Sequence, residues 1–126
     1  MKNYAIALLS ASLLAGAALA HEGHEKGKKE ADQTMTGEVL DLACYAAHEG
    51  KGAKHATCAK ECLKGGAPAG LMTADGKVYV LVNSHEAEEA YKSLKDLGGE
   101  KAAVTGHVSK RGGLQAIVVE KVEKAK

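Results

Sequence analysis

Residues 71–82 read Leu-Met-Thr-Ala-Asp-Gly-Lys-Val-Tyr-Val-Leu-Val, and this stretch gives the clearest indication of the fold. Two apolar runs flank an Asp-Gly pair, a pattern typical of a β-hairpin because glycine tolerates the positive φ of a tight turn. The returning strand alternates between two faces. Its three valines share one face, and Lys77, Tyr79 and Leu81 share the other.

Three further segments have the composition of strands. They are residues 35–44, 102–108 and 114–122. A helix is expected between the hairpin and the last two strands. It begins after a capping residue, Asn83, and ends near Leu94 or Leu97, before a pair of glycines.

The order of these elements predicts a mainly β protein, a small five-stranded barrel of the OB type. Residues 35–126 form this domain. A Cys/His-containing helical insert, residues 44–66, separates strands 1 and 2, and a helix separates strands 3 and 4. A small open sheet with helices and another kind of β-barrel remain alternatives at this point.

The insert gathers all three cysteines of the chain, Cys44, Cys58 and Cys62, together with His48 and His55. Residues 56–63 consist of helix-forming residues and are followed by two glycines and a proline, so a short helix is expected there. On a helix, three of these side chains would be spaced i, i+3 and i+7 and would share one face.

If the insert folds back on itself, Cys44 meets the pair on the helix. Three thiolates and one imidazole form a tetrahedral zinc set, and the same ligands also hold copper. His55 is the first choice for the fourth ligand because it shares the helix face with Cys58 and Cys62. His48 is the alternate, since it follows the first cysteine by four residues.

A disulfide competes with this hypothesis, because exported proteins oxidise their thiols. Cys44 could pair with Cys58 or Cys62, which would leave one spare thiol. Thiol redox activity also stays open, although the chain contains no Cys-x-x-Cys motif. The hydrolase motifs Gly-x-Ser-x-Gly and His-Glu-x-x-His are absent as well, so a binding protein is favoured over an enzyme.

The N-terminal segment has the features of an export signal. Lys2 precedes a short apolar run, and Ala18-Leu19-Ala20 matches a cleavage site, so residues 1–20 are expected to be a cleavable signal peptide. The chain would then be periplasmic or secreted, with no stable membrane insertion after cleavage.

Residues 21–34 are charged and almost free of apolar side chains, so a disordered tail is expected. Cleavage after residue 20 would leave His21 with a free α-amine beside its imidazole, and His24 lies close by. Amine and imidazole nitrogens together bind Cu(II), so the tail is a weak second metal site.

Composition argues against nucleic acid as a partner. The chain has 17 Lys and Arg residues and 16 Asp and Glu residues, and loss of the signal with Lys2 would balance the two. A balanced chain creates no positive field for a polyanion. It also has no Trp or Phe on which single-stranded bases could stack.

Four segments, residues 36–44, 55–62, 75–81 and 104–108, resemble a group of small exported bacterial proteins of uncharacterised function. Their most specific feature is a cysteine after the first strand followed by a Cys-x-x-x-Cys pair and a glycine-rich end. This resemblance implies an OB-like barrel and export. It implies no activity.

Two functions therefore stand side by side. In the first, the chain is an exported zinc- or copper-binding protein, and the ion is either structural or handled by the protein. In the second, the cysteines only staple an OB-like interaction module. That module would bind an unknown protein partner through the face with Lys77, Tyr79 and Leu81.

Overall fold

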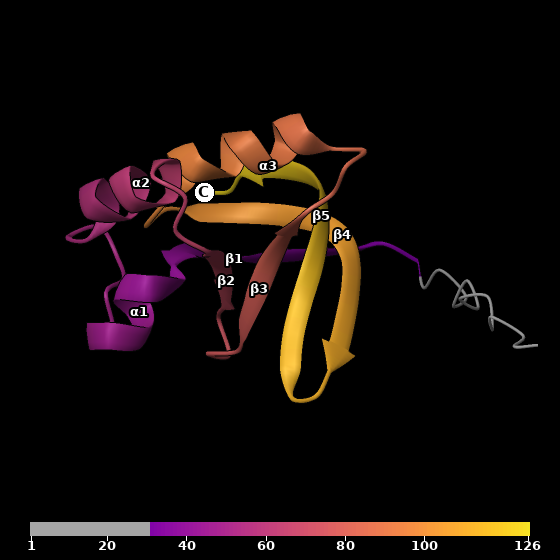
Figure 1. Ribbon diagram of the computed structural model, residues 1–126, viewed down its shortest axis with the longest axis horizontal. Helices are drawn as coiled ribbons and strands as arrows, with labels where there is room; N and C mark the ends of the chain where they lie inside the picture. Colours follow the sequence, from indigo (N-terminus) through magenta and orange to yellow (C-terminus); the bar gives the residue numbers. More distant parts are fainter. Residues whose placement is uncertain (1–30) are drawn as a thin grey trace, which may run out of the picture.

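The computed structural model describes residues 31–126, which form a small barrel with helices at one end and on one side (Figure 1). The expected signal peptide, 1–20, and the tail residues His21 and His24 lie outside the described part. The elements in chain order are β1 (Gln33–Asp41), α1 (Leu42–His48), α2 (Ala56–Lys64), β2 (Ala69–Thr73), β3 (Val78–Asn83), α3 (Glu88–Leu94), the 3-10 turn η1 (Lys95–Leu97), β4 (Lys101–Arg111) and β5 (Leu114–Lys124).

The five strands close into a barrel in the order β1-β2-β3-β5-β4, with β4 pairing back onto β1. All neighbours are antiparallel except β3 and β5, which run parallel. A parallel pair needs a crossover connection, and here the segment with α3 and β4 provides it. This arrangement confirms the predicted OB-like barrel, and the hairpin turn has its expected glycine, Gly76, at φ +80°.

The first strand differs from its prediction at both ends. It begins at Gln33, two residues before the expected start of the domain, so the end of the predicted tail 21–34 lies in the barrel. It stops at Asp41, whereas residues 35–44 were expected to be extended. Asp41 Oδ1 accepts a hydrogen bond of 2.9 Å from the N–H of Ala43, and this cap starts a helix instead.

The helix after β3 also begins later than its sequence suggests. Ser84 Oγ accepts a 3.3 Å hydrogen bond from Glu86 N–H, so the expected capping region forms a turn. The regular helix starts at Glu88, and its Tyr91 donates to the carbonyl of Leu81 at 3.3 Å.

The barrel interior is filled by aliphatic side chains and one tyrosine. Tyr79 and Leu81 belong to this core and are almost fully buried. The predicted partner face was therefore wrong, because alternation defines two faces without saying which one points inward. The outward face of β3 carries Val78, Val80 and Val82.

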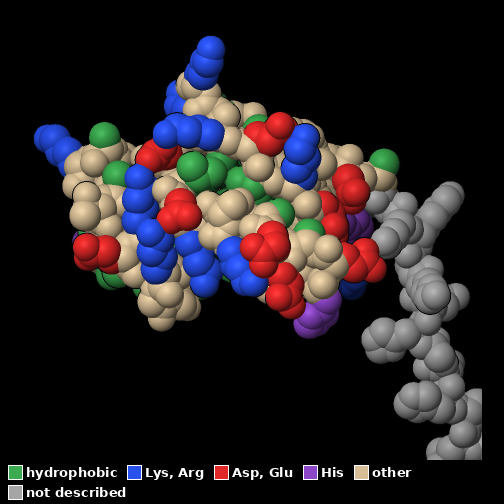
Figure 2. Space-filling model, turned by 90° about the horizontal axis from the view of Figure 1, so that it is seen from above, with side chains coloured by type: hydrophobic (Ala, Val, Ile, Leu, Met, Phe, Trp, Pro, Cys, Tyr) green, Lys and Arg blue, Asp and Glu red, His purple; other side chains and the backbone are tan. Residues whose placement is uncertain are grey.

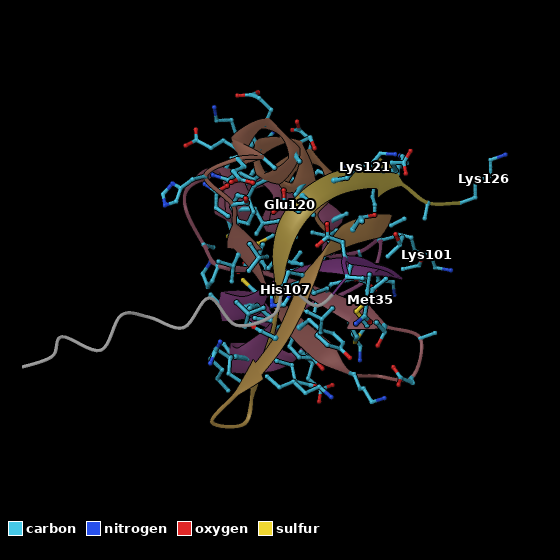
Figure 3. The ribbon with its side chains drawn as sticks, turned by 90° about the vertical axis from the view of Figure 1, so that its right-hand side faces the viewer. Met35, Lys101, His107, Glu120, Lys121 and Lys126 are labelled. Carbon is cyan, nitrogen blue, oxygen red and sulfur yellow. The ribbon has the colours of Figure 1, made fainter. Side chains whose placement is uncertain are left out.

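The outer surface mixes charges of both signs. Figure 2 shows basic and acidic side chains interspersed over the face that carries α3. Figure 3, seen from the right-hand side of Figure 1, shows β4 and β5 curving across the molecule, with His107 on β4. Within residues 31–126, no helix has the length and apolarity needed to cross a membrane.

Helix α2 is attached to the barrel by its own apolar face. Leu63 is completely buried in the core, and Ala59 is buried beside it. On the other side, the loop after η1 approaches α2 so closely that a Cβ on Gly99 would lie 2.6 Å from the Cα of Ala56. The predicted insert is thus a packed part of the domain.

Charged side chains add to this attachment. Glu100 binds both Lys60 on α2 and Lys124 on β5. Hydrogen bonds from these two ammonium groups, that from Lys124 first, lower the pKa of Glu100 to about 2. Partly exposed ion pairs of this kind contribute little to stability. The packing of Leu63 is therefore the main contribution to the attachment of α2.

We predict that Leu63→Ala lowers the free energy of unfolding by about 2–5 kcal/mol, because it leaves a cavity where α2 meets the barrel. Chemical denaturation followed by circular dichroism measures this change. Glu61→Ala, on the exposed side of the same helix, is the control and should stay within about 0.5 kcal/mol of the unaltered protein. A loss below about 1 kcal/mol for Leu63→Ala would contradict the proposed anchoring.

Candidate metal centre

Three sulfur atoms converge where α1 and α2 face each other. Cys58 Sγ and Cys62 Sγ on α2 are 4.0 Å apart, and each lies within 4.8 Å of Cys44 Sγ on α1. The predicted helix over residues 56–63 is present and spans Ala56–Lys64, which places both of its cysteines on the face toward α1. The three thiols therefore form a triangle, as the insert hypothesis required.

All three cysteines are free. A disulfide bond requires about 2.05 Å between sulfurs, and the Cys58–Cys62 separation is nearly twice that. All three being free, the expected staple between Cys44 and either Cys58 or Cys62 is not formed in this structure either.

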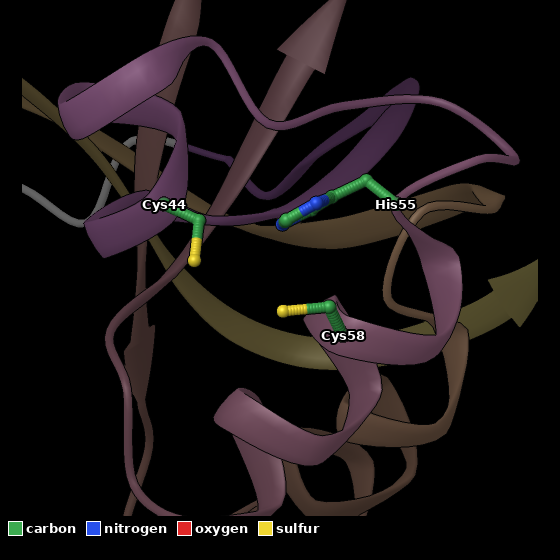
Figure 4. A group of neighbouring side chains, drawn as sticks. All are labelled: Cys44, His55 and Cys58. Atoms are coloured by element: carbon green, nitrogen blue, oxygen red, sulfur yellow. The ribbon is translucent and has the colours of Figure 1, made fainter.

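His55 lies beside two of the three sulfurs. A ring nitrogen of His55 lies within 4.8 Å of the sulfurs of Cys44 and Cys58, and these three side chains point toward one another (Figure 4). Its Nε2 is buried and has no hydrogen-bond partner. A buried polar atom without a partner is costly, so this nitrogen is a natural ligand atom for an ion.

The position of the His55 ring depends on Gly50 in the loop between α1 and α2. Gly50 is buried, and a Cβ on it would lie 2.7 Å from His55 Nε2. The loop is held by hydrogen bonds from Gly50 N–H to the carbonyl of Cys44 and from Gly52 N–H to the carboxylate of Glu38. The loop backbone thus makes room for the imidazole that the site uses.

His48, the alternate ligand, ends α1 and is exposed. Its ring meets the ring of His55 edge to face, with centroids 5.6 Å apart. Among the described residues, it belongs to neither cluster of potential ligand atoms, so the structure favours His55 over His48. The structure does not bear on the tail site predicted at His21 and His24.

Asp41 is the site residue that the sequence reasoning missed. One of its carboxylate oxygens lies within 4.8 Å of the sulfurs of Cys44 and Cys62, whereas His55 lies by Cys44 and Cys58. The side chain is 0% exposed. The available signal was its position three residues before a cysteine, since an N-capping aspartate sends its side chain back over the first turn of its helix.

The electrostatics of the cluster raise the pKa values of two of its thiols. Interaction with the Asp41 carboxylate, followed by burial and the neighbouring sulfurs, raises the pKa of Cys44 to about 12. The Cys58 thiol, burial and Asp41 raise the pKa of Cys62 as well. A bound cation would reverse this balance, because it attracts the thiolates and compensates their mutual repulsion.

The carboxylate of Asp41 shifts in the opposite direction. Burial acts to raise its pKa, but the Cys44 thiol and the N–H groups of Ala43 and Cys44 outweigh burial and hold the pKa below its usual range. The carboxyl group of Asp41 is therefore made more acidic beside Cys44 and Cys62, whose thiols are made less acidic.

Comparisons of the chain with protein-family models, with curated proteins and with solved structures found no match. The resemblance to small exported bacterial proteins stays a prediction, and the function must be argued from the site itself.

We predict that Gly50→Ala weakens ion binding about 10–100-fold, the usual effect of disturbing a residue that orients a metal ligand. The added methyl group would displace the His55 ring. Isothermal titration of the metal-free protein with zinc measures the affinity.

Lys51→Ala is the control, because it changes the exposed neighbour in the same loop. Its affinity should match that of the unaltered chain. Equal affinities for all three proteins would show that His55 is not a ligand.

Proposed function

We propose that this chain is an exported protein that binds one zinc or copper ion through Cys44, Cys58, Cys62 and His55, and that the ion is exchangeable. The observation that carries the proposal is the triangle of three free sulfurs beside an imidazole nitrogen that has no partner. Export rests on the signal-like sequence of residues 1–20.

The dimensions of the cluster support one shared ion. Four ligands about 2.3 Å from a zinc ion lie about 3.8 Å apart at the corners of a tetrahedron. The 4.0 Å between Cys58 and Cys62 is close to this value, and Cys44 Sγ lies within 4.8 Å of both of these sulfurs and of a ring nitrogen of His55. Small rotations of the side chains would bring the ligand atoms onto one centre.

Two features support an exchangeable ion over a purely structural one. Cys58 is exposed, so a competing ligand could reach its sulfur from solvent. In addition, α2 is anchored by Leu63 and by Lys60 independently of the cysteines. A structural zinc site supplies folding energy that the chain otherwise lacks, whereas this insert already has apolar packing.

Binding is favoured over thiol catalysis by the state of the sulfurs. Reactive cysteines have depressed pKa values that expose a thiolate to its target. Here the Asp41 carboxylate raises the pKa of Cys44 and contributes to the rise at Cys62. Cys44 and Cys62 are thus poorly suited to nucleophilic attack, and a bound cation would favour their thiolate forms.

We predict that Cys58→Ser weakens binding of zinc or Cu(I) by at least about tenfold, because loss of a ligand costs at least as much as loss of its supporting partner. Affinities are measured by competition with a chromogenic chelator of known affinity. The free energy of unfolding of the metal-free protein should change by less than about 0.5 kcal/mol, since the side chain is exposed.

Thr57→Ala, an exposed neighbour on the same helix, is the matched control and should bind like the unaltered chain. Unaltered affinity in Cys58→Ser would refute the proposed site. A loss of about 2–4 kcal/mol of stability without any bound ion would instead indicate a disulfide staple. Melting of α2 when the ion is chelated would assign the ion a structural role.

A further inference from the structure

We propose that Asp41 sets the ion preference of this site and selects a divalent ion, Zn(II), over monovalent Cu(I). The inference rests on the proposed function, because it concerns the same cluster. Its basis is that the carboxyl group of Asp41 has no exposed surface and lies within 4.8 Å of the sulfurs of Cys44 and Cys62.

The two oxygens of Asp41 have different tasks. Oδ1 accepts the hydrogen bond from Ala43 N–H that starts α1. Oδ2 is buried without a hydrogen-bond partner. The capping bond fixes the carboxylate, one oxygen of which lies within 4.8 Å of the sulfurs of Cys44 and Cys62. A buried carboxylate with an oxygen that lacks a partner needs a counter-charge.

The charges of the ligands indicate whether a divalent or a monovalent ion suits the site better. Three thiolates leave a net charge of about −1 around Zn(II) and about −2 around Cu(I), before Asp41 is added. The repulsion between Asp41 and the thiolates is the same in both cases. The attraction between Asp41 and the ion is twice as large for the dication, because Coulomb energy is proportional to charge.

Burial and ligand chemistry act in the same direction. Asp41 has no exposed surface, so water and salt screen its interaction with the ion only weakly. Carboxylate oxygen is an ordinary zinc ligand, whereas Cu(I) prefers sulfur. Without Asp41, three thiolates and His55 would hold either ion.

The test compares Zn(II) and Cu(I) affinities of the unaltered chain and of Asp41→Asn. Asparagine is as good a helix cap as aspartate, so this variant removes the charge and keeps the start of α1. Each affinity is measured by competition, with a zinc indicator for Zn(II) and bicinchoninate for Cu(I).

For Asp41→Asn we expect the ratio of Zn(II) affinity to Cu(I) affinity to fall about 3–10-fold. The lost attraction is twice as large for Zn(II), whereas the relief of repulsion from the three thiolates is the same for both ions. The preference would then move toward Cu(I) by at least about threefold. A merely structural role would weaken both ions equally and leave this ratio unchanged.

An unchanged ratio, whether both affinities fall together or neither falls, would overturn the selectivity. If Asp41→Asn does not fold, Asp41→Ser is used, because serine also caps a helix and carries no charge. A different result would show that the proposed function fails. In that case the unaltered chain would bind neither ion, or Cys58→Ser would bind the ion as tightly as the unaltered chain.

Discussion

The side chain of Asp41 links the barrel to the site. Its Oδ1 caps α1, and this hydrogen bond turns the chain away from β1 directly after the last barrel residue. Cys44 thereby lies in the first turn of α1, and its sulfur faces the cysteines of α2. If the strand continued through residue 44, successive side chains would point to opposite faces of the sheet. Cys44 would then lie on the strand and not on a helix that faces α2.

The site also depends on a second helix whose position does not depend on the cysteines. Leu63 is buried in the barrel core, and Lys60 pairs with Glu100. These contacts place Cys58 and Cys62 opposite α1 before any ion arrives. Preorganisation of this kind lowers the cost of binding, because few side chains need to be ordered by the ion.

Much of this arrangement could be predicted from local patterns. The Asp-Gly turn, the helix over residues 56–63 and the order of strands predict an OB-like barrel with a helical insert. Helical spacing places Cys58 near both His55 and Cys62. Three things depend on tertiary context instead. They are the end of β1 at Asp41, the inward direction of Tyr79 and Leu81, and the approach of the Asp41 carboxylate to the sulfurs of Cys44 and Cys62. Apolar residues on both sides of Asp41 read as one strand, and only the capping bond divides them.

The central claim is that one soft or borderline ion bridges the three thiols. Native mass spectrometry of the chain, exported to the periplasm and purified without chelator or reductant, tests it most directly. We expect a mass excess of one zinc or copper ion, with all three cysteines protected from alkylation until the ion is removed. A mass two units below the reduced chain, with one alkylatable thiol and no ion, would contradict the account, because it would identify a disulfide.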